Sequence, residues 1–209
     1  GTDMLVPEKL IGAQVRGGGP LNIGESKINY AVYVSNGPKL QTDAVHAGEL
    51  TFDNGTDNND SKEIGGRLGF QPIPELEVGY SIDTSRVGDK NTNFSQVAAL
   101  LQGADVSYRV DSDALRGVVN VTGEYLWTHL DRINYGTDGG AFTNNRWARY
   151  AELSYRPSKL SIPALKNLEG VFRFDQIAHP VNSPAHLHKT RYTWGLDYWL
   201  NPSTVVKVA

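Results

Sequence analysis

The 209-residue sequence has no cysteine, a single methionine and no long apolar run. Without cysteine, disulfide bonds and thiolate metal sites are excluded. A membrane-spanning helix would need about 18 or more consecutive apolar residues, and polar residues interrupt every apolar stretch earlier. The net charge of -3, without a long basic run, argues against nucleic-acid binding. A mean hydropathy of -0.39 fits either one soluble domain or a membrane protein built of strands, whose residues meet lipid only alternately.

The residue types that are abundant favour β-structure. Twenty-two glycines, ten tyrosines and four tryptophans indicate strands, turns and aromatic anchors rather than helices. No signal peptide is visible at Gly1, and the chain ends at Ala209 inside an alternating pattern. We therefore expect one β-domain over residues 1–209 that is incomplete at both ends.

Residues 102–132 carry the clearest pattern, in which two alternating segments flank a short polar turn. In the first segment Ala104 and Val106 alternate with Asp105 and Ser107, and in the second Val121 and other apolar residues do the same. A period of two places each set on one side of a sheet. Both segments are long enough to cross a hydrocarbon layer, which takes about 9–11 tilted residues. This hairpin predicts a transmembrane β-barrel.

Similar alternation recurs along the chain and predicts about ten antiparallel strands. The predicted strands cover residues 10–17, 27–35, 63–71, 76–83, 102–110, 118–130, 146–156, 170–176 and 192–200, with a last one near 206–208. Short and long connections alternate, which is typical of an up-and-down membrane barrel and unexpected in a Greek-key sandwich. Residues 36–62 form the longest polar connection, for which no packing role is predicted. Only residues 164–169, after a proline, favour a short helical turn.

In a membrane barrel the apolar face of each strand meets lipid and the charged face lines a wet lumen. Aromatic residues on the apolar face fall into two predicted levels, typical of interfacial girdles. Near the short turns lie Phe70, Tyr108, Tyr155 and Tyr198, and toward the long loops lie Tyr125, Trp127, Trp147, Tyr192 and Trp194. The alternative is an ordinary aromatic core with cross-strand pairs.

The opposite face, with its flanking turns, carries bases and acids in nearly equal number. The predicted pore-lining residues are Arg16, Lys27, Arg67, Glu77, Asp83, Asp105, Arg109, Arg116, Glu124, Glu152, Arg156, Arg173, Asp175 and Asp197. Such charges are costly in lipid and favourable along water. Their function would be to set ion preference in a pore. The alternative is a set of structural ion pairs that brace the lumen.

Four stretches of the sequence resemble a known family. The runs L-I-G-A-Q-V-R-G, K-I-N-Y-A-V-Y-V-S-N-G-P and E-I-G-G-R-L-G-F-Q-P, with the closing G-L-D-Y-W-L-N-P-S-T-V-V-K-V-A, resemble Gram-negative porins of the phosphate-selective type. The resemblance implies a channel of about sixteen strands, usually a homotrimer, in the bacterial outer membrane. Known members use a lumen dense in arginine and lysine, whereas the acids here nearly match the bases. General diffusion of small solutes is therefore expected rather than phosphate selectivity.

Other chemistry has weak support in the sequence. His179, His186 and His188 gather on one loop, but no carboxylate or cysteine stands at a metal-ligand spacing. Residues 53–60 are rich in oxygen ligands but lack the bidentate glutamate of a calcium loop. No nucleophile elbow or ordered triad is present. We therefore expect no enzyme activity, no metal and no cofactor.

Three functional hypotheses follow. The first is an outer-membrane porin-like channel for passive diffusion of small hydrophilic or ionic solutes, whose partners are membrane lipid and the transported ions. The second is a structural outer-membrane barrel that anchors or houses a partner protein without an open pore. The third is a soluble all-β binding domain, which extraction into buffer without detergent would favour.

Overall fold

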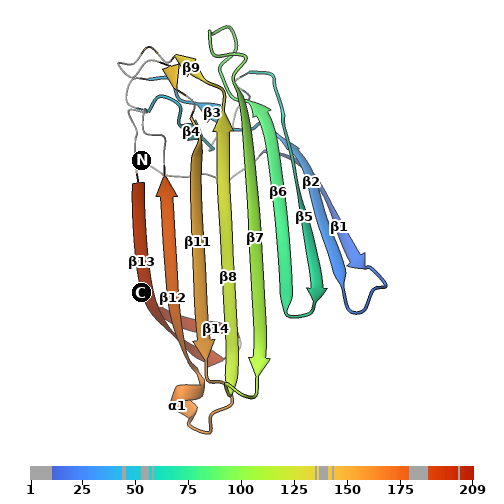
Figure 1. The fold of residues 1–209 in the computed structure, drawn as a ribbon, viewed down its shortest axis with the longest axis vertical. Helices are drawn as coiled ribbons and strands as arrows, with labels where there is room; N and C mark the ends of the chain where they lie inside the picture. Colours follow the sequence, from blue (N-terminus) through green and yellow to red (C-terminus); the bar gives the residue numbers. More distant parts are fainter. Residues whose placement is uncertain are drawn as a thin grey trace.

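The structure is a computed structural model that describes residues 11–43, 46–52, 57, 59–134, 136, 141–142, 144–178, 188–201 and 203–209. Ten strands form one antiparallel sheet in the order β1-β2-β5-β6-β7-β8-β11-β12-β13-β14 (Figure 1). Their bounds are β1 Gly12–Pro20, β2 Lys27–Ser35, β5 Glu63–Ile73, β6 Leu76–Arg86, β7 Ala98–Ser112, β8 Gly117–Leu130, β11 Arg146–Arg156, β12 Leu168–Ala178, β13 His188–Asn201 and β14 Thr204–Val208. The prediction of an all-β antiparallel fold is confirmed.

The sheet is open, with β1 and β14 at its two edges. Each strand pairs with its neighbour in the up-and-down order, and the sheet is curved, so that β14 and the end of β13 turn behind its lower end in Figure 1. Among the strands that the structure describes, the sheet therefore does not close into the ring expected of a barrel.

Short connections gather at one end of the sheet and long ones at the other, as predicted. The lower end in Figure 1 holds the connections 21–26, 74–75 and 113–116, together with the short helix α1 (Pro163–Lys166). The upper end holds the connections 36–62, 87–97 and 131–145. Two small hairpins lie in these long connections, β3 (Lys39–Leu40) with β4 (Leu50–Thr51) and β9 (Ile133–Asn134) with β10 (Ala141–Phe142). The connection between β12 and β13 lies outside the described residues.

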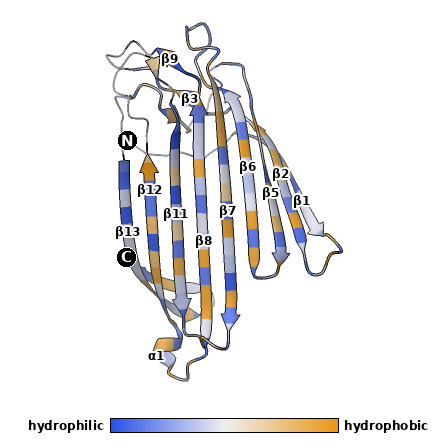
Figure 2. Ribbon diagram, in the orientation of Figure 1, coloured by the Kyte–Doolittle hydropathy of each residue, from blue (hydrophilic) through white to orange (hydrophobic). Residues whose placement is uncertain are grey.

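The two faces of the sheet differ sharply in polarity. Hydrophobic and hydrophilic residues alternate along the strands, as Figure 2 shows by colour. On the face that we call the apolar face, Trp194 is 73% exposed, Val15 69% and Tyr192 64%. Other exposed side chains of this face are Tyr30, Val32, Leu68, Phe70, Val78, Tyr80, Ile82, Val106, Tyr125, Leu153, Tyr155, Leu196 and Val208. In a water-soluble sheet the apolar side packs on a core, whereas here it is open to the surroundings.

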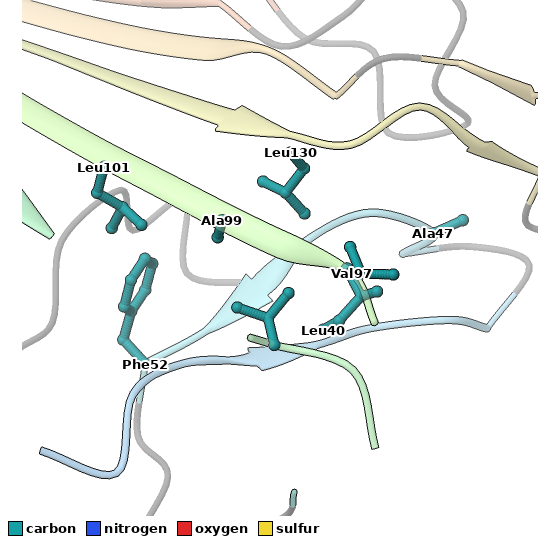
Figure 3. Close-up of a cluster of buried hydrophobic side chains, with 8 residues drawn as sticks. Leu40, Ala47, Phe52, Val97, Ala99, Leu101 and Leu130 are labelled. Atoms are coloured by element: carbon teal, nitrogen blue, oxygen red, sulfur yellow. The ribbon is translucent and has the colours of Figure 1, made fainter. Parts of the chain in front are cut away.

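A compact hydrophobic cluster lies at the long-connection end, on the opposite face (Figure 3). Its buried members are Leu40, Ala47, Phe52, Val87, Val97, Ala99, Leu101 and Leu130. The backbone N–H of Leu40 donates to the carbonyl oxygen of Val87 at 2.8 Å. The prediction that residues 36–62 have no packing role is wrong, because Leu40, Ala47 and Phe52 from this connection pack on β7 and the end of β8.

This cluster also explains why β7 begins earlier than predicted. Residues 98–101 are apolar on both faces, so they have no polar/apolar alternation to mark a strand. Ala99 and Leu101 are buried by the folded-over connection, and Ala98 and Leu100 point to the other face. β7 consequently starts at Ala98 and reaches 15 residues.

Rows of directly opposite residues connect the two predicted levels of aromatic side chains. Trp194, assigned to the long-loop level, is directly opposite Phe172. The same row of directly opposite residues runs from Phe172 through Leu153 and Val121 to Tyr108. Tyr108 was assigned to the short-turn level. Such a row runs at right angles to the strands, and the strands of a barrel tilt by about 35–45°, so one row crosses different heights. The two aromatic levels therefore stay a prediction.

Candidate functional site

The polar face carries a continuous row of titratable side chains across five strands. Asp105 lies opposite Glu124, and Glu124 lies opposite Tyr150. Tyr150 in turn lies opposite Asp175, and Asp175 lies opposite Arg191. Residues that are directly opposite have Cβ atoms about 4.5–5.5 Å apart, so this row brings residues from β7, β8, β11, β12 and β13 into one line.

A glycine in the middle strand allows charges two strands apart to pair. Arg67 on β5 donates to Asp105 on β7, from Nη2 at 2.7 Å and from Nε at 3.2 Å. Gly79 on β6 lies between them, and a Cβ atom there would be 2.3 Å from Arg67 Nη2 and 2.3 Å from Asp105 Oδ2. Arg67 also donates to Glu77 at 3.2 Å and to Asn29 at 3.0 Å. We call Asn29, Arg67, Glu77 and Asp105 the β2–β7 network.

The same arrangement recurs over β5. The Tyr33 hydroxyl on β2 donates to Asp83 on β6, across Gly65. Asn29 on β2 donates to Glu77 on β6 at 3.1 Å. Adjacent strands are about 4.8 Å apart, so long side chains two strands apart meet here because the residue between them is a glycine. We call the polar face the inner face of the sheet and the apolar face the outer one.

A second group of charges lies on the other side of the same row. Arg173 on β12 donates to Asp175 at 2.9 Å and to Glu152 at 3.5 Å, and its guanidinium lies 4.1 Å from the ring centroid of Tyr150. Arg191 lies 3.3 Å from the other carboxylate oxygen of Asp175. We call Tyr150, Glu152, Arg173, Asp175 and Arg191 the β11–β13 network. Both arginines at the centres of these networks are about two-thirds buried, at 33% and 35% side-chain exposure.

Glu124 stands between the two networks. It is half-buried and makes no hydrogen bond or ion pair with another described residue. With Tyr150, Arg173 and Asp175 it lines a hollow of about 490 Å³ on the inner face. The wall of this hollow thus presents one carboxylate that no base neutralises directly, next to paired charges of both signs.

The remaining predicted pore-lining residues are distributed more widely. Arg16, Lys27 and Arg109 lie on the polar face as exposed side chains and form no ion pair within the described part of the chain. Asp197 pairs with Lys207 at 3.0 Å. Arg156 lies 4.9 Å from the ring centroid of Trp199. Arg116 lies outside the strands, in the 113–116 turn, with a positive φ of 53°.

Three members of these networks were not predicted as site residues. Asn29 and Tyr150 belong to the predicted polar faces of their strands but carry no formal charge, so a search for ionised groups passed over them. Arg191 precedes the stretch that was predicted as a strand, whereas β13 begins at His188. The alternation of Arg191 with Thr193 and Asp197 is the signal that places it on the polar face.

The weaker sites considered from sequence are only partly covered. His179 and His186, and residues 53–56 and 58, lie outside the described residues. His188 is described, and its ring lies edge-on to Trp147 at 6.4 Å. Within the described ranges, no three His, Cys, Asp or Glu side chains are grouped so that they could hold a metal ion. No helix among the residues described is long and apolar enough to cross a membrane.

Comparison with known proteins adds no further constraint on the site. A scan against protein-family models, a search of curated proteins and a search of solved structures each found no match to this chain.

Proposed function

We propose that this chain forms part of the wall of a transmembrane β-barrel in the bacterial outer membrane, and that the barrel is a porin-like channel. It would pass small hydrophilic or ionic solutes by diffusion. The observation that carries the proposal is the polarity of the curved sheet, of which one face exposes apolar side chains and the other holds charges of both signs.

The outer face supports a lipid environment. Soluble monomers rarely expose a contiguous apolar patch larger than a few hundred Å², and here exposed apolar side chains extend from Val15 on β1 to Val208 on β14. Nine of the ten strands have between 9 and 15 residues, against about 9–11 needed to cross a hydrocarbon core. The apolar face thus has both the extent and the height that a bilayer requires.

The open edges support a larger, closed structure. In hydrocarbon, each unpaired backbone N–H and C=O group costs several kcal/mol, so a sheet crosses a bilayer only as a closed ring. The edge strands β1 and β14 offer such unpaired groups along one side each. We propose that further strands complete the ring, to about sixteen strands, and that the channel assembles as a homotrimer, as the resemblance to the porin family implies.

The inner face supports a lumen filled with water. A charged side chain facing lipid at the bilayer midplane costs about 2–4 kcal/mol, which excludes the networks around Arg67 and Arg173 from the lipid side. The β11–β13 network balances two acids with two bases, whereas in the β2–β7 network one base serves two acids. A wall with little net charge suits unselective passage of small solutes. The connection 36–62 folds over the inner face at one end, and in a closed barrel it would narrow the opening there.

The experiment that tests this function is single-channel recording of the full-length protein in a planar bilayer. Stable stepwise conductance is expected, with a reversal potential close to zero under a salt gradient. A correctly folded barrel that stays silent would instead favour the structural barrel that houses or anchors a partner protein. Protein that is folded and monomeric in buffer without detergent would overturn both membrane hypotheses in favour of a soluble binding domain.

A further inference from the structure

One basic residue stands on the apolar face of the sheet, toward the end with the long connections. Arg149 on β11 lies between Tyr125 on β8 and Gln176 on β12, which are its directly opposite neighbours. Within the described strands, the other ionised side chain on this face is Arg86, the last residue of β6. No aspartate or glutamate of those strands lies on this face.

The side chain of Arg149 is held in place by its neighbours. Its guanidinium lies 5.5 Å from the ring centroid of Trp147 and 5.7 Å from that of Phe174. Its Nε donates to Gln176 Oε1 at 2.9 Å. The two terminal nitrogens make no hydrogen bond with any described residue, and the residue is exposed. Arg149 therefore presents an oriented, unneutralised pair of N–H groups at the outer surface.

Aromatic rings and uncharged polar groups surround this position. Tyr125 stacks on Trp147 with ring centroids 6.0 Å apart and an interplanar angle of 16°, and it also contacts Trp127 at 5.4 Å. On the adjacent strands β6 and β7 of the same face, Tyr80 donates to Gln102 at 2.5 Å. Amphipathic rings and polar groups of this kind occur at the level of lipid headgroups, and the rows from Ala151 toward the short turns are apolar on this face.

We propose that Arg149 binds the phosphate of an anionic lipid headgroup, at the boundary of the apolar band on the long-connection side. This inference rests on the proposed membrane location. The planar guanidinium matches a phosphate in a bidentate arrangement, and its Nε bond and the two rings fix its direction. No acid of the described strands lies on this face to compete for it, whereas every arginine in the two inner networks is already paired with a carboxylate. The Trp147 and Phe174 rings would pack on the adjoining acyl chains.

The test uses brominated lipids, which quench tryptophan fluorescence on contact. The full-length protein, with Trp127→Phe and Trp194→Phe, keeps Trp147 as its tryptophan on the described apolar face. It is reconstituted in phosphatidylcholine with increasing fractions of brominated phosphatidylglycerol, or of brominated phosphatidylcholine. The two quenching curves yield the relative affinity of the anionic and zwitterionic lipid at this position. In this background we expect the affinity for phosphatidylglycerol to be about ten times that for phosphatidylcholine, as for a charge-assisted bond to phosphate.

Arg149→Gln should bring this ratio close to one, while Arg149→Lys, which keeps the charge without the fork, should give an intermediate ratio. Arg109→Gln removes the same charge from the inner face and should leave the ratio unchanged. If the affinity ratio is unchanged in Arg149→Gln, or is already one before this mutation, the headgroup inference is wrong while the membrane location still stands. If neither brominated lipid quenches Trp147, the membrane location itself is wrong, and the two failures are thereby distinguished.

Discussion

Arg67 and Asp105 form an ion pair across an entire strand, with the guanidinium of one on β5 and the carboxylate of the other on β7. The pair passes over Gly79 on β6, where a side chain would occupy the same space. This relationship lies on the polar face and depends on the absence of a side chain at Gly79. It shows that the charges of this face form braced networks, in which the partner of a residue is not always on the neighbouring strand.

Gly79→Ala should displace this ion pair. The new Cβ would lie 2.3 Å from both charged groups, and the mobile side chains rather than the backbone would move. We expect the free energy of unfolding to fall by about 1–3 kcal/mol, measured by urea titration of the refolded protein in detergent micelles. Gly170→Ala on β12 is the matched control, because nothing lies within 4 Å of its Cβ position. Equal stability of the two variants would mean that the pair across Gly79 contributes nothing.

Arg67→Gln should make the proposed channel more selective for cations. The change removes the base that Glu77 and Asp105 share, and Glu124 already stands unpaired beside Asp105. The reversal potential under a potassium chloride gradient is therefore expected to move toward the potassium equilibrium potential. The double variant Arg67→Gln/Asp105→Asn restores the charge balance, so its reversal potential should return most of the way to the value of the unmodified protein. A reversal potential that is the same in all three proteins would remove these residues from the pore wall.

Leu196→Asp should block membrane insertion. Leu196 is 56% exposed on the apolar face, so in water the change would be tolerated or would raise solubility. Facing lipid, the charge costs up to about 2–4 kcal/mol, and the same reasoning applies to Val121→Asp. Thr193→Asp, on the inner face of the same strand and opposite Arg173, is the control. Insertion is measured as the fraction of protein protected from protease in liposomes, and a lower fraction for the Thr193 variant would mean that the faces are reversed.

Phe52→Ala should release the connection 36–62 from the sheet without unfolding the strands. Phe52 is 4% exposed within the hydrophobic cluster, and burial of a phenylalanine in a packed core contributes about 3–5 kcal/mol. Limited proteolysis should cut the connection faster, while the β-sheet signal in circular dichroism persists. Leu115→Ala is the control, because Leu115 is exposed in a short turn. Cleavage at an unchanged rate would show that the cluster does not hold the connection.

Ion pairs of Lys159 with Asp111 and Asp113 connect the connection 157–167 with the turn 113–116 and the end of β7, and these pairs depend on pH. A hydrogen bond from Lys159 lowers the pKa of Asp113, and bonds to Asp111 and Asp113 raise the pKa of Lys159. A lowered carboxyl pKa means that the contact is fully present above the unfolded value of about 3.9 and is lost as the pH falls through the folded value. For Lys159 the contact is lost at the basic end, above about 10.4. Both contacts are therefore intact at neutral pH.

The measurement is an NMR titration of the Asp113 carboxyl carbon. Its midpoint should lie below the ordinary aspartate value in the unmodified protein and should rise in Lys159→Gln. Lys166→Gln is the control, because Lys166 lies in α1 and makes no contact with this turn. The same midpoint with and without the Lys159 amine would contradict the pairing.

Much of the secondary structure follows from local pattern. A residue at position i and one at i+2 share a face of any strand, so the division of Ala104 and Asp105 between opposite faces needed no tertiary information. The in-phase alternation of short and long connections was also readable, because turns and loops differ in composition. The pattern failed at residues 98–101 and at residues 40–52, where apolar residues are buried by a part of the chain distant in sequence.

The candidate site was likewise predictable from the sequence only in part. Which residues face the inner side was determined by the alternation of the sequence, which placed Arg67, Glu77, Asp105, Glu124, Arg173 and Asp175 on one side of the sheet. Their partners were decided by the tertiary structure, because strand register and curvature select the pairs. Arg67 reaches Asp105 because Gly79 leaves room between them, and Arg149 lies beside Phe174 only once β11 and β12 are aligned. Sequence sets the chemistry of each face through a period of two, whereas contacts between strands depend on offsets and bending that no single strand encodes.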